Sequence, residues 1–391
     1  EEYGVLELFE GQDAVSLAVA EALTGAAGLR DFDLEPAGEK PDSEAYDLYL
    51  RGRHVWHRRG SEPLQPAIDY FREAVQIDPG FARGWAALSM AYLTYPSYSP
   101  RGYATWNDAE PAAEKALSLD PDIAEAYSVL ATFAQTRFEW SRAESLFLES
   151  IRRNEQSATS HYWYAEFLET VGKHEASVGH LQRALELDPT YRPPQLMFGI
   201  AHMNFRDYPR AAELLLDVYQ NGHATQLSWM MNFMTAVYNG DASHADEWIG
   251  AGRFDDNYKA LLHRFVNAKL REQQDAALID DLANFYWRRP DYPFGTWMIG
   301  HLGGFEQVFA LVNDRLDRNR QLEMRGFWAP DIGTRDQPDF MVLLNRVGLL
   351  EYWEASGWGS MCIRSGQIVN CSGEGMTPEL LKSLLSGDTY R

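Results

Sequence analysis

A helical hairpin pattern that recurs about every 34 residues constrains this chain more than any other feature of its sequence. The clearest copy begins at Ala124 and alternates bulky and small side chains at helical spacing over two successive segments. The same pattern returns one period later. The first copy contains Tyr127, Leu130, Ala131, Ala134, Ala143, Phe147 and Ser150, and the second contains His161, Tyr164, Ala165, Leu168, Ser177, Leu181, Ala184, Asp188 and Pro189. A hairpin of this kind cannot bury its apolar face alone, so the copies must stack on one another.

Weaker copies extend the frame in both directions. Upstream copies contain Gly52, Ala67, Phe71, Ala74 and Pro79, then Trp85, Leu88, Ser89, Tyr92, Ala109, Ala113, Ala116 and Pro121. Downstream copies contain Phe198, Gly199, His202, Ala211, Leu215 and Val218, then Trp229, Phe233, Ala236, Ala245 and Ile249. Beyond Gly252 the frame decays into amphipathic segments over 257–271, 276–287 and 305–318. We therefore predict an all-α solenoid over 43–252, degenerate helical repeats over 253–320, and an irregular capping tail over 321–391 that carries the cysteine pair.

These recurring residues resemble the tetratricopeptide-repeat signature. Small residues stand where two helices cross closely, bulky residues fill the gaps between helices, and a proline follows the second helix. The resemblance implies an α-α superhelix in which the first helix of each hairpin lines a concave groove for a partner. We expect no catalytic residue and no cofactor in such a fold.

The repeat frame gives the side chains expected in the groove. Counted along the first helices, they are Tyr49, Arg53 and Trp56; Met90 and Leu93; Glu125, Ser128, Thr132 and Gln135; Tyr162, Glu166 and Glu169; Leu196, Ile200 and Met203; and Met230, Met234 and Val237. The groove is thus predicted to grade from polar to methionine-rich. Methionine is common at adaptable binding surfaces, but these side chains could instead pack under the following helices.

The two ends of the chain resemble a family of bacterial regulators that join a TolB-like domain to tetratricopeptide repeats. Residues Leu8–Leu23 are similar to the last helix of the TolB-like domain, so we expect a truncated domain over 1–24 and a linker over 25–42. Residues 43–56 are similar to the first repeat helix, and 335–357 to the closing segment. The family places a winged-helix or adenylate-cyclase domain and one membrane span upstream. The resemblance therefore implies a periplasmic part of a single-pass membrane protein; a cytoplasmic location is the alternative.

Cys362 and Cys371 are the two cysteines of the chain. Their closeness is compatible with a local disulfide in an oxidising compartment or with two free thiols in the cytosol. A similar pair closes the resembled family, and the location that the resemblance implies favours a disulfide.

The charge of the chain limits its partners. The sequence contains 57 acidic and 35 basic residues, a formal net charge of −22. This charge repels phosphate backbones and anionic lipid, so we expect no nucleic acid bound by this chain and a membrane link only through an upstream segment.

No group of residues indicates chemistry. His54 and His57 have a spacing that can place two metal ligands on one helix face, but no third ligand is fixed, so no metal site is predicted. Ser360 lacks the flanking glycines of a nucleophile elbow. The acidic residues are spread along helix faces that we expect to be solvated.

The insertion over 94–108 separates two helices of one hairpin and carries Tyr95, Tyr98, Tyr103 and Trp106. A loop of this length with so many aromatic residues is either a binding lid or a flap packed on its own solenoid.

We therefore expect a non-catalytic interaction or sensor module of a bacterial signalling or transcriptional regulator, which binds a peptide segment or partner protein in its groove. The alternatives are a scaffold that associates with itself into a homo-oligomer, and a substrate-presenting appendage of an enzyme such as an adenylate cyclase.

Overall fold

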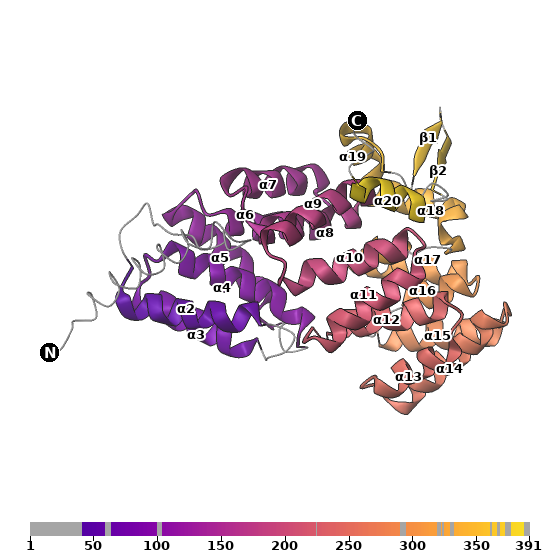
Figure 1. Cartoon of the computed structure of the whole chain (residues 1–391). Helices are drawn as coiled ribbons and strands as arrows, with labels where there is room; N and C mark the ends of the chain where they lie inside the picture. The colour runs from indigo at the N-terminus through magenta and orange to yellow at the C-terminus, as the bar shows by residue number, and fades with distance from the viewer. Residues whose placement is uncertain are drawn as a thin grey trace.

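A computed structural model describes residues 41–58, 64–99, 104–223, 225–289, 295–318, 322, 324–328, 332–359, 362–365, 368–371 and 377–386. The expected helix at Leu8–Leu23 and most of the expected linker lie outside these residues. Over the described residues helices dominate, and Figure 1 shows them stacked in chain order. This confirms the predicted all-α solenoid.

Six helical hairpins form the repeat array within the described residues, and in each the two helices pack against one another. They are α2 (Ser43–His57) with α3 (Gln65–Ile77), α4 (Ala82–Thr94) with α5 (Trp106–Leu119), α6 (Ala124–Thr136) with α7 (Trp140–Arg153), α8 (Ala158–Thr170) with α9 (His174–Leu187), α10 (Arg192–Asn204) with α11 (Tyr208–Gln220), and α12 (Gln226–Tyr238) with α13 (Ala242–Ala251). A short 3₁₀ helix, η1 (Tyr95–Ser97), follows α4.

The turns inside the last four hairpins repeat with the period of the sequence. Phe138, Gly172, Arg206 and Gly240, each 34 residues from the next, all have left-handed backbones, with φ of 61°, 75°, 61° and 71°. In each turn the next residue's amide donates to the carbonyl five residues back, at 2.8–2.9 Å. This bond satisfies a carbonyl that the ending helix leaves without a partner. The hairpins therefore share one turn geometry even where the sequence differs.

Close helix crossings explain the small residues of the repeat. A Cβ added to Gly52 would lie 2.5 Å from Phe71 Cε1, and one added to Gly199 would lie 2.7 Å from Leu215 Cδ2. The predicted crossing residues Ala131, Ala143 and Ala165 are all completely buried. Larger side chains at these positions would push the paired helices apart.

Hairpins continue downstream of the recognisable frame. Four helices follow, α14 (Asp256–Leu270), α15 (Ala276–Arg288), α16 (Gly295–His301) and α17 (Phe305–Asp317). The turns before α15 and α17 contain left-handed Glu272 and Gly303, and the next amide again donates five residues back at 2.9 Å. These helices therefore keep the turn of the repeat after its side-chain signature has faded.

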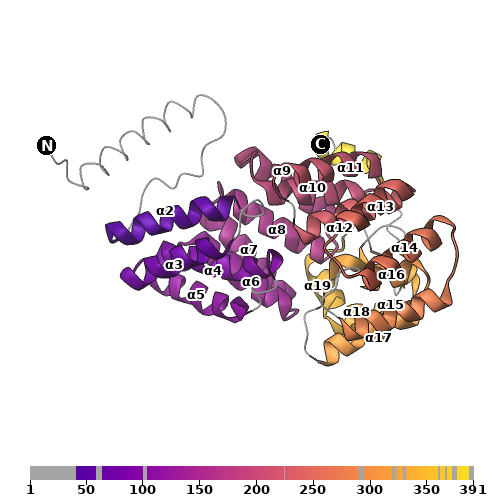
Figure 2. The same cartoon turned by 90° about the horizontal axis from the view of Figure 1, so that it is seen from below.

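The tail over 321–391 is more regular than the sequence indicates. Its described residues form η3 (Met324–Phe327), η4 (Gly333–Asp336), α18 (Pro338–Arg346), α19 (Leu349–Ser356), β1 (Ile363–Ser365), β2 (Ile368–Asn370) and α20 (Pro378–Ser386). Strands β1 and β2 pair antiparallel. The tail runs back along the array, so that η3 contacts α8, α19 contacts α7 and α20 contacts α9 (Figures 1 and 2).

Indole hydrogen bonds attach this tail to the turns of two hairpins. Three tryptophan N–H groups donate to backbone carbonyls across the contact: Trp328 Nε1 to Thr170 O at 2.9 Å, Trp353 Nε1 to Val171 O at 2.8 Å, and Trp140 Nε1 to Val347 O at 2.6 Å. All three indoles are at least 97% buried. The α8–α9 turn thus has its backbone carbonyls satisfied by residues more than 150 positions away in the chain.

Candidate partner-binding surface

Twelve of the predicted groove residues recur at a spacing of 34 residues, three on the first helix of each of four successive hairpins. We call these twelve the groove positions. They are Ser128, Thr132 and Gln135 on α6; Tyr162, Glu166 and Glu169 on α8; Leu196, Ile200 and Met203 on α10; and Met230, Met234 and Val237 on α12.

The groove positions of α6 and α8 keep polar side chains partly accessible. Thr132, Gln135, Tyr162 and Glu166 are all half-buried. Gln135 Nε2 lies 3.4 Å from Thr170 Oγ1 and donates to it, while that hydroxyl donates to the Glu166 carbonyl at 2.9 Å. The first bond crosses from α6 to α8, and the second, within α8, holds the Thr170 hydroxyl that accepts it.

The groove positions of α10 and α12 are mostly core. Met203 is 2% exposed and Met234 is 4% exposed, and Met230 alone of the predicted methionines is half-buried. Of the two interpretations left open by the sequence, packing in the core describes Met203 and Met234, and they do not line an open groove as their groove positions predict. The downstream helices pack back against this half. Trp297 of α16 contacts Phe233 with ring centroids 6.4 Å apart.

The predicted beginning of the groove is also largely buried. Tyr49 is 7% exposed, and its ring packs on Phe71 and Phe81 with centroids 6.1 and 5.1 Å apart. Burial raises the pKa of its phenol, and Arg53 Nη1 donates to the phenol oxygen at 3.3 Å. Trp56 is 6% exposed. Tyr49 and Trp56 thus stabilise the first hairpin, and only Arg53 of the three is half-buried.

Glu169 is a buried structural carboxylate instead of a groove residue. It is 2% exposed, its Oε2 lies 2.6 Å from Nδ1 of fully buried His174, and Asn204 Nδ2 donates to the same oxygen at 2.9 Å. The three residues come from α8, the start of α9 and the end of α10. A buried carboxylate needs such partners, so this cluster ties three helices together.

The described residues of the insertion after α4 include aromatic side chains that pack on the solenoid. The ring of Tyr98 lies against that of His223, just before α12, with centroids 6.0 Å apart. Trp106 begins α5 and contacts Phe133 of α6 at 5.2 Å. Tyr103 lies outside the described residues. Of the two interpretations of this insertion, a binding lid or a flap packed on the solenoid, Tyr98 and Trp106 fit the packed flap.

The candidates for chemistry do not assemble into a site. His54 is exposed, and exposed His57 has its Nε2 3.3 Å from Arg53 Nη2. Ser360 lies outside the described residues. Within the part of the chain that the structure describes, no three His, Cys, Asp or Glu residues are grouped to hold a metal ion.

Cys362 and Cys371 are joined by a disulfide in the structure, and both are almost fully buried. They flank the β1–β2 hairpin. The bond therefore closes a short loop within the tail.

No helix among the described residues is long and apolar enough to cross a membrane.

Comparisons with known proteins find one repeat family and curated relatives of low identity. A tetratricopeptide-repeat family model matches residues 135–192. Anaphase-promoting complex subunit 3 of Schizosaccharomyces pombe is 23% identical over 256 residues, which cover 65% of this chain and 32% of that protein. Transcriptional regulator HilA of Salmonella typhimurium is 26% identical over 215 residues, 53% of this chain and 38% of HilA. The chain thus spans about a third of the length of these curated relatives.

Solved structures with a similar arrangement have low sequence identity. The anaphase-promoting complex hetero-tetramer Cut9–Hcn1 gives a TM-score of 0.47 at 15% identity, covering 77% of this chain and 55% of the matched chain. Yeast Tom70 gives 0.41 at 12% identity, covering 89% and 75%. Pseudomonas aeruginosa PilF gives 0.41 at 20% identity, covering 54% and 93%.

The family match falls on the α6–α10 region, where the turns repeat at a 34-residue spacing. The described hairpins on either side have the same helix pairing. The family model thus describes the α6–α10 region, and the described hairpins on either side continue its helix pairing.

Proposed function

We propose that this chain is a protein-binding repeat module that holds an extended partner segment on the groove positions of α6 and α8. The observation that carries the proposal is the row of four half-buried polar side chains, Thr132, Gln135, Tyr162 and Glu166, presented by two adjacent hairpins. A hydrogen bond from Gln135 on α6 to Thr170 on α8 helps to hold this surface in place before any partner arrives. A preorganised surface loses less entropy on binding.

The chemistry of the row favours a basic, extended segment. Hydroxyl and amide groups of Thr132 and Gln135 can pair with a partner's backbone, and Glu166 supplies a carboxylate. Tyr162 adds an aromatic surface that is steadied by an edge contact to Tyr191 at 5.5 Å. The net charge of −22 steers positively charged segments toward the array.

We also infer that the module serves a bacterial regulator, with partner binding reported to an effector domain outside this sequence. The similarity to HilA, which is named a transcriptional regulator, supports this role. The buried disulfide supports an oxidising, periplasmic location. The coding sequence upstream of Glu1 tests the role. A winged-helix or cyclase domain with a membrane span there supports the regulator role. An unrelated enzyme there contradicts that role and favours the alternative of a substrate-presenting appendage.

Selection from a phage library of random 16-residue peptides, followed by affinity measurement, tests the binding surface. We expect enriched peptides to carry lysine or arginine, and the double variant Thr132→Arg/Glu166→Lys to weaken their binding by about a hundredfold, since it places two cations on the row. Glu213→Lys, on the exposed side of α11, is the matched control and should bind as the original chain does.

Two outcomes contradict the proposal. Equal binding by the double variant and the control places the peptide elsewhere. Failure to enrich any peptide, together with a mass that rises with concentration in sedimentation, replaces peptide capture by the self-association alternative.

A further inference from the structure

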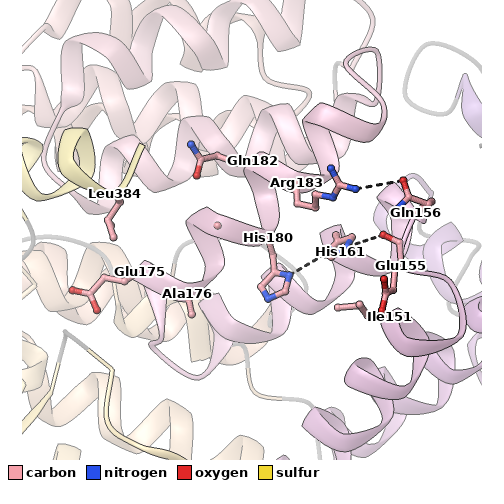
Figure 3. Close-up of a pocket in the computed structure, with 11 residues that line it drawn as sticks. Ile151, Glu155, Gln156, His161, Glu175, Ala176, His180, Gln182, Arg183 and Leu384 are labelled. Atoms are coloured by element: carbon pink, nitrogen blue, oxygen red, sulfur yellow. Dashed lines mark hydrogen bonds between the residues drawn. The ribbon is translucent and has the colours of Figure 1, made fainter. Parts of the chain in front are cut away.

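A trough lies on the exposed side of α9, away from the groove positions. Its volume is about 590 Å³, and it runs between the α7–α8 connection and α20. Figure 3 shows the His180 side chain pointing into it, with the loop residues Glu155 and Gln156 on one side and Leu384 on the other.

Hydrogen bonding fixes which nitrogen of His180 carries a proton. His161 Nε2 lies 3.3 Å from the Glu155 carbonyl, which can only accept, so that nitrogen carries hydrogen. Neutral His161 then has an unprotonated Nδ1. His180 Nδ1 lies 2.9 Å from it and must be the donor. The remaining nitrogen, His180 Nε2, is left as a hydrogen-bond acceptor in the trough.

The surroundings keep His180 neutral. Burial, together with the nearby His161, lowers the pKa of His180 to about 4. Burial also lowers the pKa of His161. The ring of Tyr164 covers one edge of His180, with centroids 4.7 Å apart. At neutral pH the acceptor on Nε2 is therefore retained.

The floor of the trough is apolar and open. A Cβ added to Gly179 would meet nothing within 4 Å, and its neighbour Ala176 is exposed. Ile151 and Leu384 form apolar walls. An unbranched aliphatic chain fits over such a floor.

The charged groups of the trough favour a cation. Glu155 and Glu175 contribute two carboxylates at its rim. Arg183 also lines the trough, and its guanidinium donates to Gln156 Oε1 at 3.4 Å and to Glu186 Oε2 at 3.1 Å. Two carboxylates against one guanidinium leave the lining of the trough with an excess of negative charge.

We propose that this trough is a second binding site, which takes an alkylammonium group: the ammonium donates to His180 Nε2, the carboxylates of Glu155 and Glu175 attract its charge, and its aliphatic stem lies over Gly179. The group could belong to a free aliphatic amine or to a lysine side chain of a partner. The site is independent of the groove positions, and its failure would leave the proposed function unaffected.

Titration of the chain with n-pentylamine, N-acetyl-lysine methylamide and n-pentanol, followed by ¹H–¹⁵N spectra of the imidazoles, tests the site. We expect His180 to show the Nδ1–H form and its Nε2 signal to move with both amines, with Kd on the order of 1 mM for so small a ligand. Pentanol should bind at least about tenfold more weakly, because it lacks the charge. Movement with the lysine derivative alone assigns the site to a protein partner, and movement with both assigns it to the ammonium group in general.

The variant Gly179→Leu tests amine binding without disturbing the fold. Leucine fills the open floor without a clash and has a higher helix propensity than glycine, so the variant should fold and lose at least about tenfold in amine affinity. Gly250→Leu on α13 is the matched control, because its Cβ also meets nothing. Unchanged amine binding by Gly179→Leu, or an Nε2–H form of His180, overturns the proposal.

Discussion

The α6–α8 half and the α10–α12 half of the array follow one repeat frame but present different surfaces. Thr132 on α6 and Glu166 on α8 are half-buried, whereas Ile200 and Met234, at the same position one and two periods later, are buried. The backbone is equivalent in both halves, since the turns share one geometry. On α12 the difference comes from the downstream helices that pack back against it, such as α16 through Trp297 and Phe233. Position in a repeat therefore sets where a side chain lies along a helix, and distant segments decide whether it stays accessible.

The sharpest way to break this comparison is to place the same charge at equivalent positions of the two halves. Met234→Lys puts an ammonium group into a site that is 4% exposed, and we expect a loss of more than about 4 kcal/mol of unfolding free energy. Thr132→Lys, the matched variant, should cost less than about 0.5 kcal/mol. Urea unfolding measures both. Similar losses would mean that the two halves are equally buried.

Removing one of the indoles that attach the tail to the array should also lower the stability strongly. Trp353→Ala deletes a ring that is 1% exposed and leaves the Val171 carbonyl without its donor, so we expect a loss of about 3–5 kcal/mol. Limited proteolysis should then cut first between α17 and α20. Trp287→Ala is the control, because that ring is 49% exposed. Cleavage that begins instead in α2–α5 would show that the tail does not depend on this contact.

Removing the disulfide should destabilise the tail by a smaller amount. The Cys362→Ser/Cys371→Ser variant should lose about 2.5–3 kcal/mol of local stability, the value expected when a loop this short is no longer closed. Amide hydrogen exchange should rise around β1 and β2 and stay unchanged in α2–α7. Thiol titration of the original chain made in the periplasm should find no free thiol. Two reactive thiols would contradict both the bond and the inferred location.

Acid should destabilise both halves of the array, because each contains a histidine whose pKa is lowered by burial: His180 on α9 and His202 on α10. Burial lowers the pKa of His180 from 6.5 to about 4 and also lowers the pKa of His202, so the unfolded chain binds more protons in this range. Stability from the neutral rings is complete above about pH 6.5 and falls as the pH drops toward 4, by roughly 2–3 kcal/mol for His180. His180→Phe should flatten that slope in urea midpoints measured from pH 7 to 4. An unchanged slope would assign the acid sensitivity to other groups.

The smallest expected effect concerns the repeated turn. Arg206 adopts a left-handed backbone with φ of 61°, which is strained for a side chain but not for glycine. Arg206→Gly should raise stability by about 1 kcal/mol, and Gly240→Ala, at the equivalent position with open space around it, should lower it by a similar amount. Thermal melts compare the two. The same sign for both would show that the turns are not equivalent.

Much of the solenoid could be predicted from the sequence. Ala131, Ala143 and Ala165 are buried crossing residues as the frame requires, and α2 begins at Ser43, where the pattern begins. These features follow from neighbouring residues, because each hairpin is folded by contacts within itself and with the next one.

The candidate surfaces were predicted less well. The frame placed Gln135, Tyr162 and Glu166 where accessible side chains are found, but it could not reveal that Glu169 pairs with His174. The His161–His180 contact was also missed, since the spacing of two histidines on different helices is typical of no known site.

The sequence by itself determined the period, the hairpins and the crossing residues, because these depend on interactions a few residues to one repeat apart. Only the tertiary structure decided which groove positions remain accessible and which become core. On α12 that outcome depends on where the downstream helices return, through contacts such as that of Trp297 on α16 with Phe233. No local pattern encodes such a contact, since a buried tryptophan has the same helical or loop signature whatever surface it covers.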